Sequence, residues 1–250
     1  MIGIASFKEY FKGFEDQYVI IGGTACEILM SDNSLNFRAT KDIDLVLIIE
    51  TLTKEFCEIF WQYINDAGYE HISKATNKSE YYRFSNPKSP NYPKMIELFS
   101  KKQDWLLSSI KQNIIPIHID DEVSSLSAIL LDDTYYNFLT KGISKIHGIS
   151  ILKAEHIIPF KAKAWIDLTY RKEHGELIDS KDIKKHRNDI IRLSTLLSPN
   201  LNMTLPNKIK EDLSFFIQKI NEEEFNLKQL GINHISKEQL VQFLNQFYNL

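Results

Sequence analysis

Two aspartates near residue 43 have the spacing of a metal-binding pair. Asp42 and Asp44 flank Ile43 in the stretch DIDLVLIIE, whose apolar residues indicate a buried strand that starts near Ile43. Side chains alternate faces along a strand, so the two carboxylates point the same way while Ile43 points into the core. Carboxylates this close repel each other, and a divalent cation removes that conflict. Oxygen ligands of this kind favour Mg²⁺ or Mn²⁺.

A pair of glycines upstream of the aspartates belongs to the same sequence pattern. The run YVII at 18–21 is rich in β-forming residues and ends at Gly22 and Gly23, after which TACEILM favours a helix. Without a Cβ at either glycine, backbone N–H groups can approach phosphate oxygens, and a helix that begins at Thr24 adds a favourable partial charge. A DxD pair alone is common, and two solvated acids at a strand edge are its plain alternative. The specific signal is the order of strand, glycine turn, helix and a strand entered through DID.

The composition indicates a globular protein that can bury a large core. Its 250 residues are 43% hydrophobic and 25% charged, with few glycines and prolines for low-complexity linkers. The formal net charge of −3 argues against general attraction to a polyanion, so a nucleic-acid contact requires a local basic patch. Cys26 and Cys57 fall on apolar helix faces, which argues against a disulfide framework or a zinc site. Without a signal peptide or an apolar run of membrane-spanning length, we expect a cytoplasmic protein with no membrane partner.

The order of the expected elements describes an α/β (α+β) domain followed by a helical one. A short helix over 4–14 precedes the first strand, and an amphipathic helix over 53–67 ends at Gly68. The runs YYRFSNP, PKMIELFS and IIPIHID supply three more strands, which gives a mixed sheet of about five strands flanked by helices. From about residue 120 the pattern becomes helical. We therefore expect a core domain at 1–125 and a mainly helical C-terminal domain at 126–250.

Four helices are expected in the C-terminal half. A long one begins near Lys153 and ends near Gly175. Ser180 can cap the next, SKDIKKHRNDIIRLSTLL, which ends before Pro199. Two further helices are expected near 206–222 and 236–248.

The glycine pair, the DID motif and the elements between them resemble a known family. Strand, GG, helix and DID resemble the DNA polymerase β-like nucleotidyltransferase superfamily, and RATKDIDL resembles its AbiEii/MenT group of toxin nucleotidyltransferases. The resemblance implies a polymerase β-like fold whose active site adds a third carboxylate from a neighbouring strand. The matching residue is Glu97 in MIELF, with Ile96 and Leu98 facing the opposite side. Asp42, Asp44 and Glu97 would then be the metal ligands, although a solvent-facing strand residue is the alternative for Glu97.

Two later segments extend the resemblance. FKAKAWIDL at 160–168 resembles the family's helical lysine motif, in which Lys161 matches the lysine thought to hold the nucleotide's phosphates. SKDIKKHRNDIIRL at 180–193 resembles the family's following helix, where Asp182 matches a functional acid and Lys185 lies in the same stretch. The resemblance therefore adds Lys161 and Asp182 to the catalytic residues. A plain exposed helix would also be charged, which is the alternative for Lys185.

Two departures from the superfamily pattern concern residues that are expected to bind the nucleotide. Thr24 stands where the superfamily commonly has Ser, although a Thr hydroxyl can make a similar phosphate hydrogen bond. The interval from Gly23 to Asp42 is longer than in compact members and agrees with the insert that precedes RxTxDxD in the toxin group, from which Arg38 can reach the site. The expected nucleotide-binding residues are Gly22, Gly23, Thr24, Arg38, Lys161 and Lys185.

The resemblance implies transfer of a nucleoside monophosphate from an NTP to an acceptor, with release of pyrophosphate. By resemblance the acceptor is the 3′ end of tRNA, the enzyme is toxin-like and a cognate antitoxin is its partner. Lys181, Lys184, Lys185 and Arg192 recur near one face of the helix at 180–193 and could contact the RNA backbone. A protein hydroxyl or a small molecule such as an aminoglycoside is an alternative acceptor. The alternative from another class is a non-catalytic nucleotide- or partner-binding module of the same fold.

Overall fold

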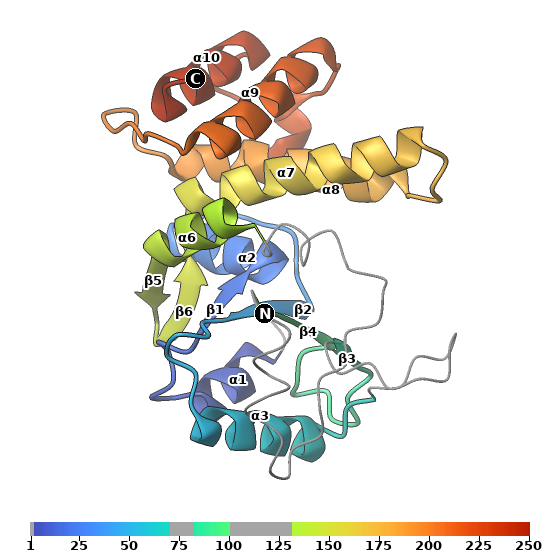
Figure 1. Cartoon of the computed structure of the whole chain (residues 1–250). Helices are drawn as coiled ribbons and strands as arrows, with labels where there is room; N and C mark the ends of the chain where they lie inside the picture. The colour runs from blue at the N-terminus through green and yellow to red at the C-terminus, as the bar shows by residue number, and fades with distance from the viewer. Residues whose placement is uncertain (1–2, 71–82, 101–131) are drawn as a thin grey trace. The chain divides into compact units, whose positions relative to one another are not determined.

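The computed structural model describes residues 3–70, 83–100 and 132–250, and the chain in these ranges forms two compact units (Figure 1). The strand expected in IIPIHID at 114–120 lies outside the described residues. The units are interleaved along the chain, whereas the sequence predicts a single boundary after residue 125. The first unit comprises Met1–Ile28, Arg38–Asp132 and Ile143–Leu152, and the second comprises Leu29–Phe37, Asp133–Gly142 and Lys153–Leu250.

The first unit is built on a mixed sheet, which has six strands among the described residues in the order β3-β4-β2-β1-β6-β5. Strand β2 runs antiparallel to β1 and parallel to β4, and β6 runs parallel to β1. The prediction of a mixed sheet flanked by helices, with a helical C-terminal part, is confirmed. The hairpin β5–β6 is an addition that the sequence analysis placed in the helical half. The strands are β1 (Tyr18–Ile21), β2 (Asp42–Leu47), β3 (Arg83–Ser85), β4 (Met95–Phe99), β5 (Ile143–Ile146) and β6 (Ile149–Leu152).

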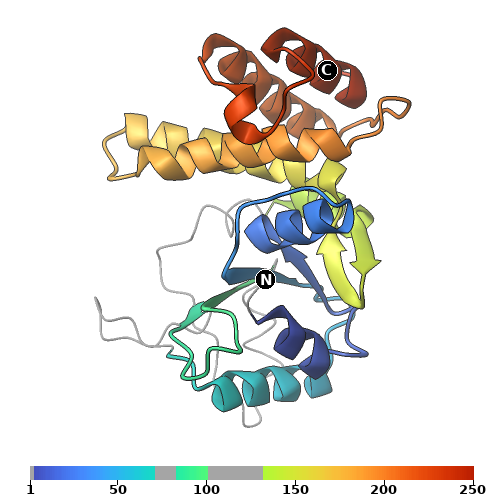
Figure 2. The same ribbon diagram turned by 180° about the vertical axis from the view of Figure 1, so that it is seen from behind.

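Helices α1 (Ile4–Tyr10) and α3 (Lys54–Ala67) cover one face of this sheet through aromatic rings (Figures 1 and 2). Phe7 of α1 meets Tyr18 of β1 edge to face, with ring centroids 5.3 Å apart. Phe60 of α3 meets Phe84 of β3 in the same way at 5.5 Å. Because side chains alternate along a strand, the opposite face is left for the residues of the candidate site.

Helix α2 (Gly22–Asp32) follows β1 without an intervening turn. The sequence predicts a glycine turn and a helix that starts at Thr24, but Gly22 and Gly23 already form the first helical turn. The N–H groups of a first turn have no partner within their helix. The end of β1 therefore carries the electropositive end of α2.

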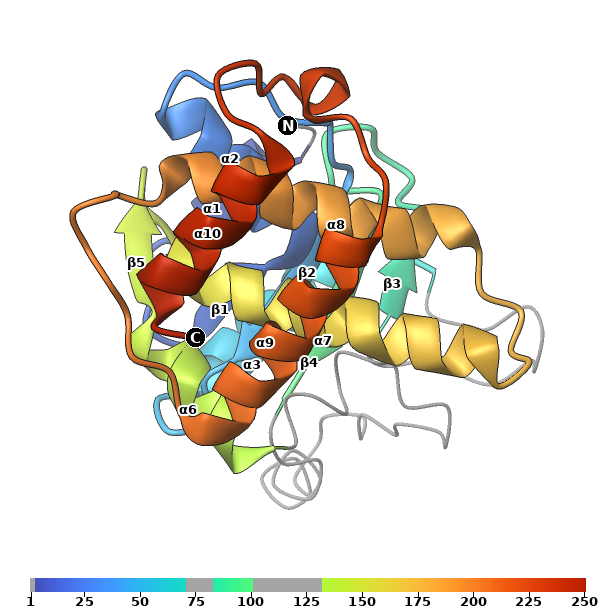
Figure 3. The same cartoon turned by 90° about the horizontal axis from the view of Figure 1, so that it is seen from above.

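The second unit is helical (Figure 3). Helix α7 packs against α8 and α9, and α9 packs against α10. Trp165 of α7 meets Phe216 of α9 edge to face at 5.3 Å. Asp179, one residue before the predicted cap Ser180, caps α8, because its carboxylate accepts the N–H of Lys181 at 2.9 Å. The helices are α6 (Asp133–Lys141), α7 (Ala154–Glu173), α8 (Ser180–Leu193), α9 (Asn207–Glu222) and α10 (Lys237–Tyr248), with short 3-10 helices η1 (Ser194–Leu196) and η2 (Leu227–Leu230).

The described part of the chain can be compared with the predictions on the two cysteines and on membrane-spanning segments. Within the described residues neither Cys26 nor Cys57 forms a disulfide; the first is buried and the second half-buried. Within residues 3–70, 83–100 and 132–250, no helix has the length and apolar character needed to cross a membrane.

His156 of α7 is a buried histidine that should make stability depend on pH. Its ring lies over Phe138 of α6 with centroids 4.5 Å apart, and a Cβ added at Gly142 would lie 2.2 Å from its Cγ. Burial, followed by the charge of Lys153, lowers the pKa of His156 from 6.5 to about 4. The unfolded chain therefore takes up a proton near pH 6.5 that the folded chain resists until about pH 4. We expect the free energy of unfolding to fall as the pH falls through this window.

The variant His156→Gln removes the titrating group, so it should flatten this part of the pH dependence. Urea unfolding at pH 7, 5.5 and 4.5 would measure it, with His234→Gln as a control because His234 is exposed. The control should keep the native slope. Equal slopes for the native chain and His156→Gln would contradict the assignment.

Candidate functional site

The predicted carboxylates lie on one face of the sheet at neighbouring positions. In the parallel pair β2–β4, Asp42 lies beside Met95 and Asp44 lies beside Glu97. Asp42 is exposed, Asp44 and Glu97 are half-buried, and the intervening residue Ile43 is buried. This alternation is the one that the sequence predicts. The sheet register thus brings three acidic residues from two adjacent strands to the face opposite α1 and α3.

Gly22 provides the space that the Asp44 carboxylate occupies. Asp44 is paired with Ile21 at the end of β1, so its side chain projects toward the start of α2. A Cβ built on Gly22 would lie only 1.7 Å from Oδ2 and 2.7 Å from Cγ of Asp44. Gly22 also has φ 68°, a conformation that favours glycine. The carboxylate therefore lies directly against the backbone of the first turn of α2.

Arg38 approaches the same turn from the segment between α2 and β2. A Cβ on Gly23 would lie 3.0 Å from Nη2 of Arg38 and 2.9 Å from Cγ2 of Thr40. A guanidinium group and the N-terminus of a helix are both electropositive. Their proximity is therefore suited to phosphate oxygens, which accept hydrogen bonds from both.

The hydroxyl of Thr24 is used within the protein. It donates to the backbone carbonyl of Asp42 at 2.5 Å and lies 3.2 Å from Oγ1 of Thr40. The N–H of Thr40 donates to the Glu27 carboxylate at 2.8 Å, and the Thr40 hydroxyl donates to the same oxygen. These bonds tie the first turns of α2 to the residue that begins β2. The predicted hydrogen bond from the Thr24 hydroxyl to a phosphate would require that hydroxyl to leave Asp42.

Sequence reasoning did not single out Glu27 and Thr40. One signal was present, because Thr24 and Glu27 have the T-x-x-E spacing of a helix capping box. In the structure Glu27 instead accepts bonds from Thr40, thirteen residues along the chain. The spacing thus indicates that this helix start is stabilised but does not identify the partner.

Arg83 is a further residue of this face that the sequence analysis did not single out. It lies opposite Glu97 in the antiparallel pair β3–β4. Its Nε and Nη2 atoms lie 2.7 Å and 2.6 Å from Oε1 of Glu97. The sequence holds a basic residue in YYRFSNP, but only the strand register places it against an acid.

The donor set of this face fits a divalent cation, although its three acids do not yet form a complete site. Carboxylate oxygens are the hard ligands that Mg²⁺ and Mn²⁺ prefer. No described residue forms an ion pair with Asp42. Among the residues that the structure describes, however, no three acidic, histidine or cysteine side chains are gathered closely enough to hold a metal ion. A metal role for Asp42, Asp44 and Glu97 together stays a prediction, and in this structure the Glu97 carboxylate is held by Arg83.

In the second unit, Lys161 is engaged in a buried ion pair. Its Nζ donates to Oδ2 of Asp189 on α8 at 2.8 Å, and both residues are buried. Asp182 and Lys185 are exposed on α8. The roles of these residues toward a nucleotide stay predictions.

Replacing Lys161 by methionine should lower stability as well as any activity. Asp189 is fully buried, so loss of its lysine partner should cost about 3–5 kcal/mol of unfolding free energy. Lys163→Met is the matched control, because Lys163 pairs with Asp212 at the same 2.8 Å but both side chains are more exposed. Chemical denaturation of the three proteins would compare the two costs. If Lys161→Met unfolds at the native denaturant concentration, the pair does not stabilise the helices.

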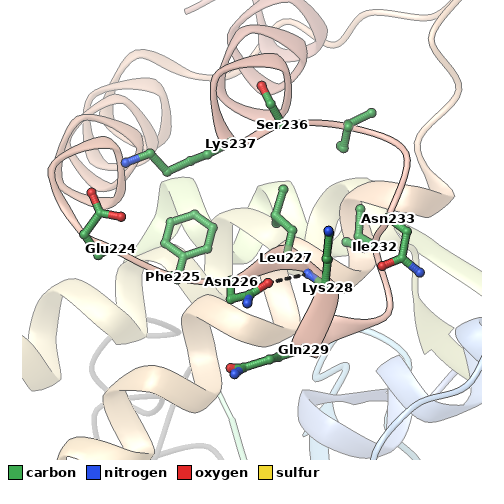
Figure 4. A pocket seen from close by; sticks show the side chains of 11 residues that line it. Glu224, Phe225, Asn226, Leu227, Lys228, Gln229, Ile232, Asn233, Ser236 and Lys237 are labelled. Atoms are coloured by element: carbon green, nitrogen blue, oxygen red, sulfur yellow. Dashed lines mark hydrogen bonds between the residues drawn. The ribbon is translucent and has the colours of Figure 1, made fainter.

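A hollow of about 650 Å³ in the second unit contains none of the predicted site residues (Figure 4). It lies between η2 and the start of α10, and Phe225, Leu227 and Ile232 contribute its apolar lining. Lys237 donates to the carbonyl oxygens of Asn221 and Glu223 at 2.9 and 3.1 Å, at the end of α9. Lys237 thus caps the end of α9.

The comparisons with known proteins find distant structural likenesses. The chain is similar to the solution structure of the antibiotic-resistance factor ANT(2'')-Ia, with 13% identity, a TM-score of 0.37 and coverage of 88% of this chain and 92% of that chain. It is also similar to the crystal structure of the Megavirus polyadenylate synthase, with 12% identity and a TM-score of 0.28; the match covers 99% of this chain and half of that one. No family model and no curated protein matches the sequence.

Proposed function

We propose that the chain is a metal-dependent nucleotidyltransferase that transfers a nucleoside monophosphate from an NTP to the 3′ end of tRNA. The observation that carries the proposal is the position of Asp44 against the Gly22 backbone, at the N-terminus of α2. Asp42 and Glu97 share its face of the sheet, and the Arg38 guanidinium lies at Gly23. Asp44, which we propose as a metal ligand, thus lies beside groups suited to phosphate at one helix start.

Each of these residues has a role in such a transfer. Asp42 and Asp44 would hold Mg²⁺ or Mn²⁺, which neutralises charge on a triphosphate when bound. The N–H groups at Gly22 and Gly23, together with Arg38, would hold phosphate oxygens in place. Glu97 would complete the metal site or accept the proton of the attacking hydroxyl. Positioning and electrostatics would then supply most of the catalysis.

An RNA acceptor is supported by the surface of α8. Lys181, Lys184 and Lys185 are exposed and recur on one side of the helix, which makes a local basic stripe on a chain of net charge −3. Arg192 at the other end is only half-exposed and lies 5.8 Å from the ring centroid of Phe37. The three lysines would therefore contribute most to backbone contacts. A toxin-like role with an antitoxin partner rests on the resemblance of RATKDIDL to the toxin group.

Incubation of the purified chain with total tRNA, Mg²⁺ and each labelled NTP in turn tests the proposal. Label transferred to RNA by the native chain, and not by Asp42→Ala/Asp44→Ala, would establish the activity and the preferred base. Transfer to an added protein or to an aminoglycoside instead would keep the reaction and change the acceptor. Metal-dependent NTP binding without transfer to any acceptor would favour a non-catalytic binding module.

A further inference from the structure

We propose that Arg83 is a displaceable counter-ion. It pairs with Glu97, the third carboxylate of the face, until a divalent cation replaces it. Arg83 would then set how tightly the site binds metal. The inference rests on the proposed function, because it requires that the carboxylate face binds a cation.

The contact between the two side chains is close but uses one carboxylate oxygen. Both Nε and Nη2 of Arg83 approach Oε1 of Glu97, at 2.7 and 2.6 Å. The strongest arginine–carboxylate pairs are bidentate, with two parallel bonds to two oxygens. The Arg83 contact directs both nitrogens to one oxygen, so it holds the carboxylate without saturating it.

The exposure of the two partners is unequal, which favours exchange. The Arg83 side chain is 43% exposed and the Glu97 side chain is 15% exposed. A guanidinium this exposed regains hydration when it leaves, and ion pairs of this kind contribute little net stability. A carboxylate as buried as Glu97 is stabilised by a partner, because burial removes part of its contact with water. Glu97 therefore favours an occupant, and Arg83, as the more exposed partner, is the side chain that a cation would displace.

Strand β3 does not depend on this ion pair for its place in the sheet. It pairs with β4 through its backbone over Arg83–Ser85, and Ser85 also forms an antiparallel bridge with Glu70. Phe84 is fully buried and packs against Phe60 and Trp61 of α3, at centroid distances of 5.5 and 5.7 Å. The backbone and Phe84 hold the strand, so the Arg83 side chain can swing outward without unfolding it.

Arg83 and Asp44 lie on opposite sides of Glu97 in the sheet. Glu97 lies beside Asp44 in the register of β2 and β4, and Arg83 lies on the other side of Glu97 in the register of β3 and β4. The same carboxylate thus has a cation on one side and an acid on the other. A divalent ion between the acids would compete with Arg83 for Glu97.

Titration of the full chain with Mn²⁺ alone, followed by the electron paramagnetic resonance of free Mn²⁺, tests the proposal without any enzymatic reaction. We expect Arg83→Gln to bind Mn²⁺ about two- to fivefold more tightly than the native chain, the range given by a partly exposed ion pair. Arg83→Lys keeps the charge but loses the planar fork, so its affinity should lie between the two. In a chain that already carries Glu97→Gln, adding Arg83→Gln should leave the affinity for Mn²⁺ unchanged.

A charge control separates competition from general electrostatics. Lys94 is an exposed cation one residue before β4, and Lys94→Gln removes the same charge without touching Glu97. At physiological salt its effect should be small, because exposed charges are screened. Unchanged or weaker Mn²⁺ binding by Arg83→Gln would overturn the proposal, as would an equal gain from Lys94→Gln. If neither the native chain nor any variant binds Mn²⁺, while circular dichroism shows that all of them are folded, the prediction of a metal site is wrong.

Discussion

Asp44→Asn should reduce nucleotidyl transfer by at least about 10³-fold while leaving the chain folded. Asparagine has nearly the same shape as aspartate, so it fits the space against Gly22 that a Cβ would close. It lacks the negative charge that a divalent cation requires. Asp42→Asn should have a similarly large effect, because Asp42 is exposed on the same face and contributes little to the core.

Initial rates of label transfer at saturating Mg²⁺ would measure both variants. Asp16→Asn is the matched control, because Asp16 is an exposed acid of the same unit that lies before β1. The control should keep the native rate, and all three variants should show native circular dichroism. If Asp42→Asn and Asp44→Asn retain rates within a few-fold of native, the acids are a solvated pair at a strand edge.

The carboxylate face could be predicted from the sequence because it depends on local features. Alternation along β2 is sufficient to put Asp42 and Asp44 on one side and Ile43 in the core. The two glycines after YVII indicate a close approach to the backbone at the end of β1. Gly22 has a positive φ, a conformation that favours glycine. Neither conclusion needs to know which strands are neighbours.

Features that depend on pairing between distant segments could not be predicted in this way. Arg83 faces Glu97 only because β3 and β4 pair in one particular register. The hairpin β5–β6 joins the sheet through Ile20 and Ile151, which no short-range pattern connects. Its turn carried a weak signal, since Gly148 is a typical residue of tight hairpin turns. Short strands inside a largely helical region are otherwise easily taken for helix.

Gly22→Ala should lower both transfer and stability, whereas Gly13→Ala should lower stability alone. Both glycines have a positive φ, 68° and 91°, so alanine should introduce backbone strain of about 1–2 kcal/mol at either position. The positions differ in their surroundings. A Cβ at Gly22 would overlap the Asp44 carboxylate at 1.7 Å, whereas a Cβ at Gly13 would meet nothing within 4 Å.

The overlap at Gly22 can be relieved only by moving Asp44 or the first turn of α2. A displacement of about 1 Å in a catalytic group can cost roughly 10²-fold in rate, so we expect a loss of that size for Gly22→Ala. Unfolding and transfer assays on both variants, together with Mn²⁺ titration, would separate strain from displacement. Since the two share the backbone strain, the difference between them measures how far the reaction depends on Asp44 lying against this turn. Equal transfer rates for Gly22→Ala and Gly13→Ala would show that the carboxylate can function from another position.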